Sequence, residues 1–181
     1  NGVLKNKLNI TDQNTLDDTE TLLLSDAYEK FLKKLENEEV EINLDLIFEI
    51  NKYFLGTLYS WAGKIRRVEI SKDGTLFCAS INIENELKLL DELISNISAD
   101  NKTVLSEKLS VIHCEFNAIH PFREGNGRTI RLFLDLVALA NGYKLIDFSK
   151  SSKTQYIQAC ISGMKQDYSK MKSVIYKGLL K

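Results

Sequence analysis

Apolar side chains recur along most of this chain at intervals of three and four residues, which is the period of an amphipathic helix. The pattern predicts helical segments at residues 15–36, 44–58, 83–97, 104–119, 129–140 and 155–180. Residues 129–140 are apolar on nearly every side, so we expect this segment to be the central helix, buried by the others. The sequence therefore predicts an all-α fold, a helical bundle.

Residues 68–77 interrupt the helical pattern. Apolar and polar residues alternate over 68–71, Asp73 and Gly74 form a turn signal, and Leu76 and Phe77 resume the apolar character. This predicts a single β-hairpin. An isolated hairpin is only marginally stable in water, so it must pack against the body or serve a function. A free strand edge can bind an extended peptide as an added strand; a plain surface connector is the alternative.

Length and charge limit the class of protein. A chain of 181 residues with 44% hydrophobic and 27% charged residues suits one globular domain, residues 1–181. Its net charge of −1 gives no overall field that would recruit nucleic acid or an anionic membrane. The most apolar run, residues 130–140, is too short to span a membrane and contains Arg131 and Asp135.

Cysteine usage favours a reducing compartment. The three cysteines are scattered and form no C-x-x-C pair, so we expect reduced thiols in a cytoplasmic protein. The chain opens on Asn1 rather than on methionine, which leaves open whether further residues precede it.

Most of the candidate chemistry lies in one loop, residues 120–131, which reads His-Pro-Phe-Arg-Glu-Gly-Asn-Gly-Arg-Thr-Ile-Arg. Pro121 disfavours helical geometry at His120, so the imidazole should project from the end of the preceding helix. A histidine of ordinary pKa, near 6.5, suits a general base at neutral pH. The alternative is a structural histidine, which is our interpretation of His113.

The second half of the loop has the features of a phosphate site. Gly125 and Gly127 let the backbone approach a ligand, and the helix behind them offers free N–H groups to an anion. Asn126 can add an amide donor. Arg128 and Arg131 share a helix face and could reach along a polyphosphate. Glu124 is the single carboxylate by which Mg²⁺ is typically held beside phosphate oxygens.

Each of these residues also has a plain structural explanation. The arginines could form a solvated face, with an Arg131–Asp135 ion pair one helical turn apart, and the glycines could form an ordinary turn. Phe122 should pack the loop onto the core. All of this chemistry falls within one loop before an apolar helix, so we favour a nucleotide site. The chain has no G-x-x-x-x-G-K-[ST] loop and lacks the third glycine of a dinucleotide fingerprint.

Residues 120–131 match the Fic family motif, H-x-F-x-[D/E]-G-N-G-R-x-x-R, at every defined position. The similarity extends to residues 59–66, 70–72 and 3–8, so the chain resembles this family over nearly its whole length. The resemblance implies a Fic-fold helical bundle with one β-hairpin flap. It also implies an enzyme, a protein adenylyltransferase, which moves AMP from ATP to a Tyr, Thr or Ser hydroxyl of a target protein.

The resemblance also implies residue roles. His120 would take the proton of the target hydroxyl, and Glu124 would hold Mg²⁺ between the α- and β-phosphates. The remaining loop residues would bind the nucleotide: Gly125, Asn126 and Gly127 at the α-phosphate, Arg128 and Arg131 further along the triphosphate. The flap would dock the target as an added strand, through residues Ile70, Ser71, Lys72, Asp73 and Gly74.

Family members are often inhibited by a helix bearing [S/T]-x-x-x-E-[G/N], whose glutamate pairs with the second motif arginine, here Arg131. Residues 80–85 fit that string, but they follow the flap instead of lying in a terminal helix. We therefore attribute the match to chance and expect Glu84 to face solvent or the next helix. The resemblance then implies a separate small antitoxin, with this chain as the toxin of the pair and a type II topoisomerase as a candidate target.

Two alternatives remain open at this stage. A relative of this kind could transfer another phosphate-containing group or remove AMP. The chain could also be a non-catalytic regulator that binds nucleotide.

Overall fold

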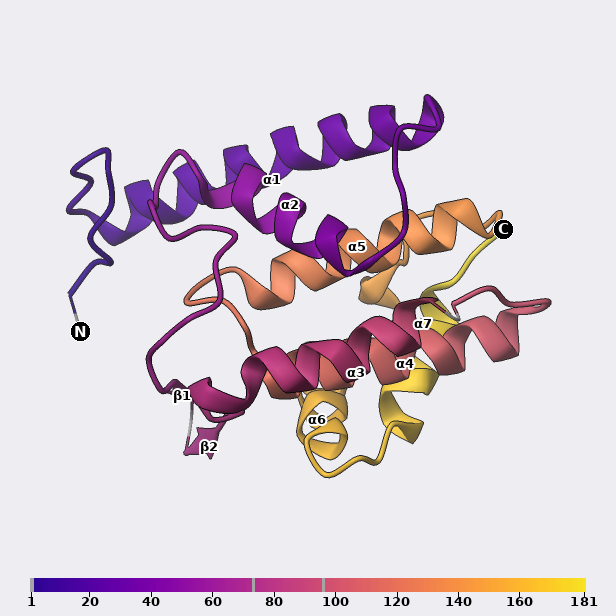
Figure 1. Cartoon of the computed structure of the whole chain (residues 1–181). Coiled ribbons are helices and arrows are strands. Elements are labelled where there is room, and N and C mark those ends of the chain that lie inside the picture. The colour runs from indigo at the N-terminus through magenta and orange to yellow at the C-terminus, as the bar shows by residue number, and fades with distance from the viewer. Residues whose placement is uncertain (1, 73, 96) are drawn as a thin grey trace.

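The computed structural model describes residues 2–72, 74–95 and 97–181 and is mostly helical, which confirms the predicted fold class (Figure 1). Its α-helices are α1 (Gln13–Glu36), α2 (Leu44–Leu55), α3 (Ile83–Ser95), α4 (Lys102–Ile119), α5 (Asn126–Ala140), α6 (Lys153–Gly163) and α7 (Ser169–Gly178). Short 3-10 turns η1 (Ser80–Asn82) and η2 (Phe148–Lys150) join some of them. No described helix is both long and apolar enough to cross a membrane.

Helix α5 is the centre of the bundle, as its apolar character predicts. It packs against α1, α2 and α4, and its side chains from Leu132 to Ala138 are all buried. The one charged side chain among them, Asp135, accepts hydrogen bonds from the Tyr28 hydroxyl and the Ile146 N–H, both at 2.8 Å. The Arg131–Asp135 ion pair, which belonged to the structural alternative, is absent from the ion pairs of the described residues, and partners from α1 and from the loop after α5 bind the two carboxylate oxygens.

Most helix boundaries differ from the sequence prediction by two or three residues, and one predicted helix is divided in two. Helix α5 begins at Asn126 instead of residue 129, and α2 ends at Leu55 instead of residue 58. The segment 155–180 divides into α6, which ends at Gly163, and α7, which begins at Ser169, and Gln166 turns the chain between them with a φ of 60°. Asp167 then accepts from the N–H and hydroxyl of Ser169, which starts the second.

The hairpin is present and short. Strands β1 (Ser71–Lys72) and β2 (Thr75–Leu76) pair antiparallel, with Ser71 opposite Leu76 and Lys72 opposite Thr75. Of the predicted flap residues, Gly74 turns the chain with a φ of 77°, and Asp73 lies outside the described residues. The hairpin is also tied to the body, because the N–H of Cys78, which follows β2, donates to the Ala118 carbonyl of α4 at 3.0 Å.

Candidate active site

His120 lies at the C-terminal end of α4 in the left-handed conformation, with φ 51° and ψ 58°. Such a backbone is uncommon for a residue other than glycine, and it turns the chain out of the helix, as the following Pro121 requires. The backbone N–H of His120 still donates to the Phe116 carbonyl at 2.9 Å. The imidazole therefore occupies a fixed position beyond the last turn of the helix.

The imidazole of His120 is held on two sides. The ring of Phe77, just after β2, stacks on it with centroids 3.8 Å apart, and Nδ1 lies 3.3 Å from the Asn117 carbonyl oxygen. Because a carbonyl oxygen only accepts, this contact places the proton on Nδ1 and leaves the lone pair on Nε2. Burial lowers the pKa of His120 to about 4, so the ring is neutral at pH 7. A neutral imidazole with Nε2 free can accept a proton.

Arg66 joins the hairpin to the end of α4, a role that the sequence did not reveal. The side chain is buried, with the residue 2% exposed, and donates to the His120 carbonyl at 2.7 Å. It also donates to the carbonyls of Val68 and Cys78, one on each side of the hairpin. Arg66 and Arg67 are adjacent, and no local pattern shows which of them is buried. Only its place in the similar segment 59–66 could have drawn attention to it.

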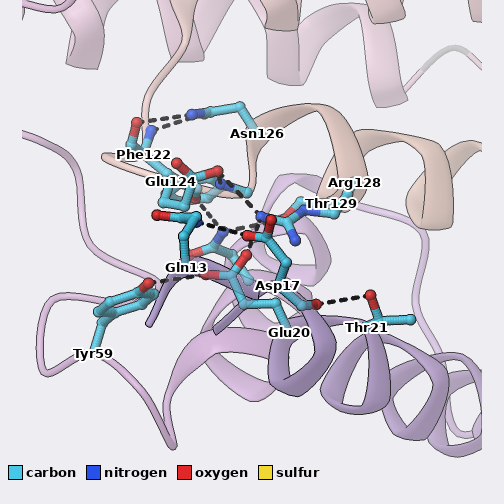
Figure 2. A network of polar contacts seen from close by, with 12 residues as sticks. Gln13, Asp17, Glu20, Thr21, Tyr59, Phe122, Glu124, Asn126, Arg128 and Thr129 are labelled. Atoms are coloured by element: carbon cyan, nitrogen blue, oxygen red, sulfur yellow. Dashed lines mark hydrogen bonds and ion pairs between the residues drawn. The ribbon is translucent and has the colours of Figure 1, made fainter. Parts of the chain in front are cut away.

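The loop after His120 is closed by its own side chains. The Asn126 amide oxygen accepts from the Phe122 N–H at 2.9 Å, and its Nδ2 donates to the Phe122 carbonyl at 2.8 Å (Figure 2). The Asn126 side chain is buried and shapes the loop, with one of its two amide N–H bonds donated to Phe122, and its nucleotide-binding role stays a prediction. Phe122 packs in the core against Phe48, as predicted.

Asn51 of α2 fixes the same loop from behind and was missed by the sequence analysis. It is fully buried and donates to the Glu124 carbonyl at 3.2 Å and to the Thr129 hydroxyl at 3.1 Å. Its own amide oxygen accepts from the Gly63 N–H at 2.8 Å. An asparagine within an apolar helix is the only signal for it in the sequence, and its partners are too distant along the chain to be inferred.

Helix α5 starts at this loop with Gly125 as its N-cap. The first N–H groups of a helix have no carbonyl partner within it, so those of the first turn of α5 can bind an anion. Gly125 has a φ of 80°, and a Cβ there would lie 2.7 Å from Leu55 Cδ1. A Cβ on Gly127 would meet nothing within 4 Å. The fold thus requires the first glycine, while the second keeps open space above the first turn.

The charged residues of the loop interact with one another and with α1. Arg128 Nη2 lies 2.6 Å from Glu20 Oε2 and 3.1 Å from Glu124 Oε1 (Figure 2). Arg131, one turn further along α5, is half-buried, with its guanidinium 6.0 Å from the Tyr156 ring centroid. The structure therefore brings Glu124 and Arg128 together and leaves Arg131 separate from that cluster.

His113 and Ser80, the first residue of the inhibitor-like string 80–85, each bind a neighbouring side chain of the fold. His113 is buried, and its Nε2 lies 2.8 Å from the Tyr156 hydroxyl, in agreement with a structural role. Ser80 donates to Glu69 Oε1 through both its N–H and its hydroxyl, so this serine closes the base of the hairpin. Glu84 is exposed at the start of α3, as expected.

The two glycines should respond differently to alanine. Gly125→Ala should cost at least about 1–3 kcal/mol of stability, because a left-handed alanine is strained and also overlaps Leu55. Gly127→Ala should leave stability equal or raised by up to about 1 kcal/mol, since alanine is the better helix former. The same Gly127→Ala change should weaken binding of a nucleoside triphosphate, because the added methyl group fills the open space above the first turn of α5. Chemical denaturation and calorimetry would measure both effects; a Gly127→Ala protein with unchanged binding would contradict the phosphate site.

The imidazole of His120 should remain neutral well below its ordinary pKa. At pH 5.5 an ordinary histidine is about nine-tenths protonated, whereas burial should keep both His120 and His113 largely neutral, each with a pKa of about 4. Phe77→Ala should raise the pKa of His120 toward 6.5, because it admits water to the ring, and should leave His113 unchanged. NMR titration of the two imidazoles, assigned with the His120→Ala variant, provides the measurement. Titration of His120 near pH 6.5 in the unmodified protein would refute the argument.

Comparison with known proteins supports the resemblance to the Fic family. Residues 41–138 match the model of the Fic/DOC family. The chain is 32% identical over 177 residues to a probable protein adenylyltransferase, y4lH, of Sinorhizobium fredii, covering 96% of this chain and 89% of that protein. It is 30% identical over 185 residues to the protein adenylyltransferase VbhT of Bartonella schoenbuchensis, covering 98% of this chain and 37% of that longer protein.

A solved structure shares the fold. The crystal structure of the BepC effector protein of Bartonella tribocorum, with bound AMPPNP, superposes with a TM-score of 0.80 at 24% identity and covers 98% of this chain and 92% of that one. The family model spans more than half of the chain, and the first relative aligns over almost all of it. On these grounds, the chain belongs to the Fic/DOC family.

Proposed function

We propose that this chain is a protein adenylyltransferase, which moves AMP from ATP to a hydroxyl group of a target protein. The observation that carries the proposal is a neutral imidazole at the end of α4, whose Nε2 has no hydrogen bond to the described residues, followed by a helix N-terminus suited to phosphate. Relatives similar over nearly the whole chain are named protein adenylyltransferases, and the similar BepC structure holds an ATP analogue, which supports the assignment.

In the proposed reaction the target oxygen attacks the α-phosphorus of ATP. His120 Nε2 accepts the hydroxyl proton as the new O–P bond forms, and the bond between the α-phosphorus and the bridging oxygen breaks, so that pyrophosphate leaves. The first-turn N–H groups of α5 stabilise charge on the α-phosphate oxygens. Stacking on Phe77 and the contact to Asn117 fix the ring, so little reorganisation precedes proton transfer.

Glu124 is the residue that would hold Mg²⁺. Its carboxylate is half-exposed beside the first turn of α5, and one carboxylate together with phosphate oxygens is the usual magnesium site. Mg²⁺ bound there would neutralise charge on the α- and β-phosphates. The chain's own part is to supply one carboxylate oxygen.

The hairpin is the proposed docking site for the target protein. It lies against the imidazole through Phe77, and the side chains of Ser71 and Lys72 are exposed. An extended segment of the target, added beside the hairpin as a strand, would bring its hydroxyl close to His120. A type II topoisomerase is the target class that we would test first.

The decisive experiment is incubation of the chain with labelled ATP, Mg²⁺ and either a bacterial lysate or a purified type II topoisomerase. Label at the α-phosphate should be transferred to protein, and label at the γ-phosphate should not. His120→Ala should lower the transfer rate by about 10² to 10⁴-fold, because a general base contributes that much. It should leave the far-UV circular dichroism and ATP affinity nearly unchanged. Transfer of γ-label would indicate another phosphate-group reaction, and ATP binding without any transfer would indicate a regulatory protein.

We further propose that inhibition comes from a separate partner. None of the ion pairs among the described residues involves Arg131, and Glu84 is exposed at the start of α3. Glu84→Gly should therefore leave automodification unchanged. A helical peptide carrying Ser-x-x-x-Glu-Gly should inhibit transfer, because its glutamate would compete with the triphosphate for Arg131, and Arg131→Ala should blunt this inhibition. A large gain of automodification in Glu84→Gly, measured with α-labelled ATP, would overturn the separate-partner proposal.

A further inference from the structure

Helix α1 contributes a buried carboxylate to the loop, outside the family motif. Glu20 is only 6% exposed, although it lies in a helix with many charged and solvated positions. Its Oε1 accepts from the Tyr59 hydroxyl at 2.8 Å, and its Oε2 lies 2.6 Å from Arg128 Nη2. A buried carboxylate is costly unless it is paired and hydrogen-bonded, and here each oxygen has one partner.

Arg128 links this carboxylate to Glu124. The same Nη2 atom that contacts Glu20 also contacts Glu124 Oε1 at 3.1 Å. The guanidinium is held from another side by the Phe54 ring, 4.9 Å from the ring centroid. One cation therefore serves two carboxylates, and it is fixed mainly by the shorter and more deeply buried contact with Glu20.

The two oxygens of Glu124 differ as a result. Oε1 accepts from Arg128 and from the Gly125 N–H, the latter at 2.7 Å. The hydrogen bonds and ion pairs of the described residues leave Oε2 without a protein partner. A magnesium site beside phosphates needs one carboxylate oxygen in a fixed position, and Glu124 offers Oε2 for it.

We infer that Glu20 is a positioning residue, which acts through Arg128 to keep Glu124 Oε2 free for a divalent cation. The inference rests on the proposed function. Its physical basis is the planar fork of the guanidinium, which binds a lone carboxylate through two parallel hydrogen bonds. Without the charge of Glu20, Arg128 would pair with both oxygens of Glu124 and compete with the metal. Engagement by Glu20 prevents that bidentate pair.

The test measures metal binding directly. Mn²⁺ serves as the paramagnetic probe with AMPPNP, and electron paramagnetic resonance of the full chain gives its dissociation constant. Glu20→Gln preserves side-chain size and an acceptor for Tyr59 but removes the charge that faces Arg128. We expect the Mn²⁺ dissociation constant to rise by about 10-fold or more, since residues that orient a metal ligand typically contribute 10–100-fold to affinity. Affinity for AMPPNP without metal should change by less than twofold.

Asp26→Asn is the matched control. Asp26 also lies on α1 and also accepts a tyrosine hydroxyl, that of Tyr53 at 2.8 Å, and no ion pair or hydrogen bond of the described residues joins its carboxylate to the loop. This variant should bind Mn²⁺ as the unmodified chain does. A lowered metal affinity in Asp26→Asn equal to that in Glu20→Gln would reduce the effect to a general perturbation of α1 and overturn the inference.

Two other outcomes would also overturn it. Unchanged Mn²⁺ affinity in a folded Glu20→Gln protein would show that Glu124 needs no such support. Tighter binding of metal-free AMPPNP would show instead that Glu20 withholds Arg128 from phosphate. If Glu20→Gln does not fold, Glu20→Asp, whose shorter side chain withdraws from Arg128, must show the same loss of metal affinity.

Failure of the proposed function is distinguishable from failure of this inference. A chain that binds Mn²⁺ with AMPPNP in a Glu20-dependent way, but transfers no α-label to any protein, would contradict adenylyl transfer and leave the positioning role intact.

Discussion

The buried guanidinium of Arg66 lies where three parts of the molecule meet: the stem before the hairpin, the stem after it and the C-terminal end of α4. The last carbonyls of a helix have no partners within it, and a cation there satisfies them and complements the helix dipole. Arg66 donates to the carbonyls of His120, Val68 and Cys78. The left-handed turn at His120 and the position of the hairpin beside the imidazole are therefore set by the same side chain.

A second constraint comes from the core. Helix α5 is buried through most of its length. Its N-terminal end is reached from solvent beside the loop that follows His120. Asn51 and Asn126 use their amides to satisfy the backbone and side-chain groups of that loop. These amide contacts fix the loop that joins the neutral imidazole of His120 to the first turn of α5. Polar side chains that bind no ligand themselves thus give the site its shape.

The positive charge of Arg128 is paired with carboxylates of the chain itself. Glu20 and Glu124 share one guanidinium, while Arg131 lies a turn further along α5, with its guanidinium 6.0 Å from the Tyr156 ring centroid. Arg128 and Arg131 lie three residues apart on one face of α5, yet their surroundings differ. One is engaged by carboxylates of the chain itself, and the other takes part in none of the ion pairs of the described residues.

The sequence by itself determined the helical class, the burial of most side chains of residues 129–140, the hairpin and the grouping of His120, Glu124 and the glycines, because periodicity and contiguous motifs are local signals. Tertiary structure decided the partners of the charged and amide side chains. Asp135 bonds to Tyr28 instead of Arg131, Asn126 closes its own loop, and Arg128 meets Glu20, more than a hundred residues away. Such pairs depend on which helices pack together. Spacing along one helix shows which side chains can reach each other, and burial against a neighbouring element decides which of them actually pair.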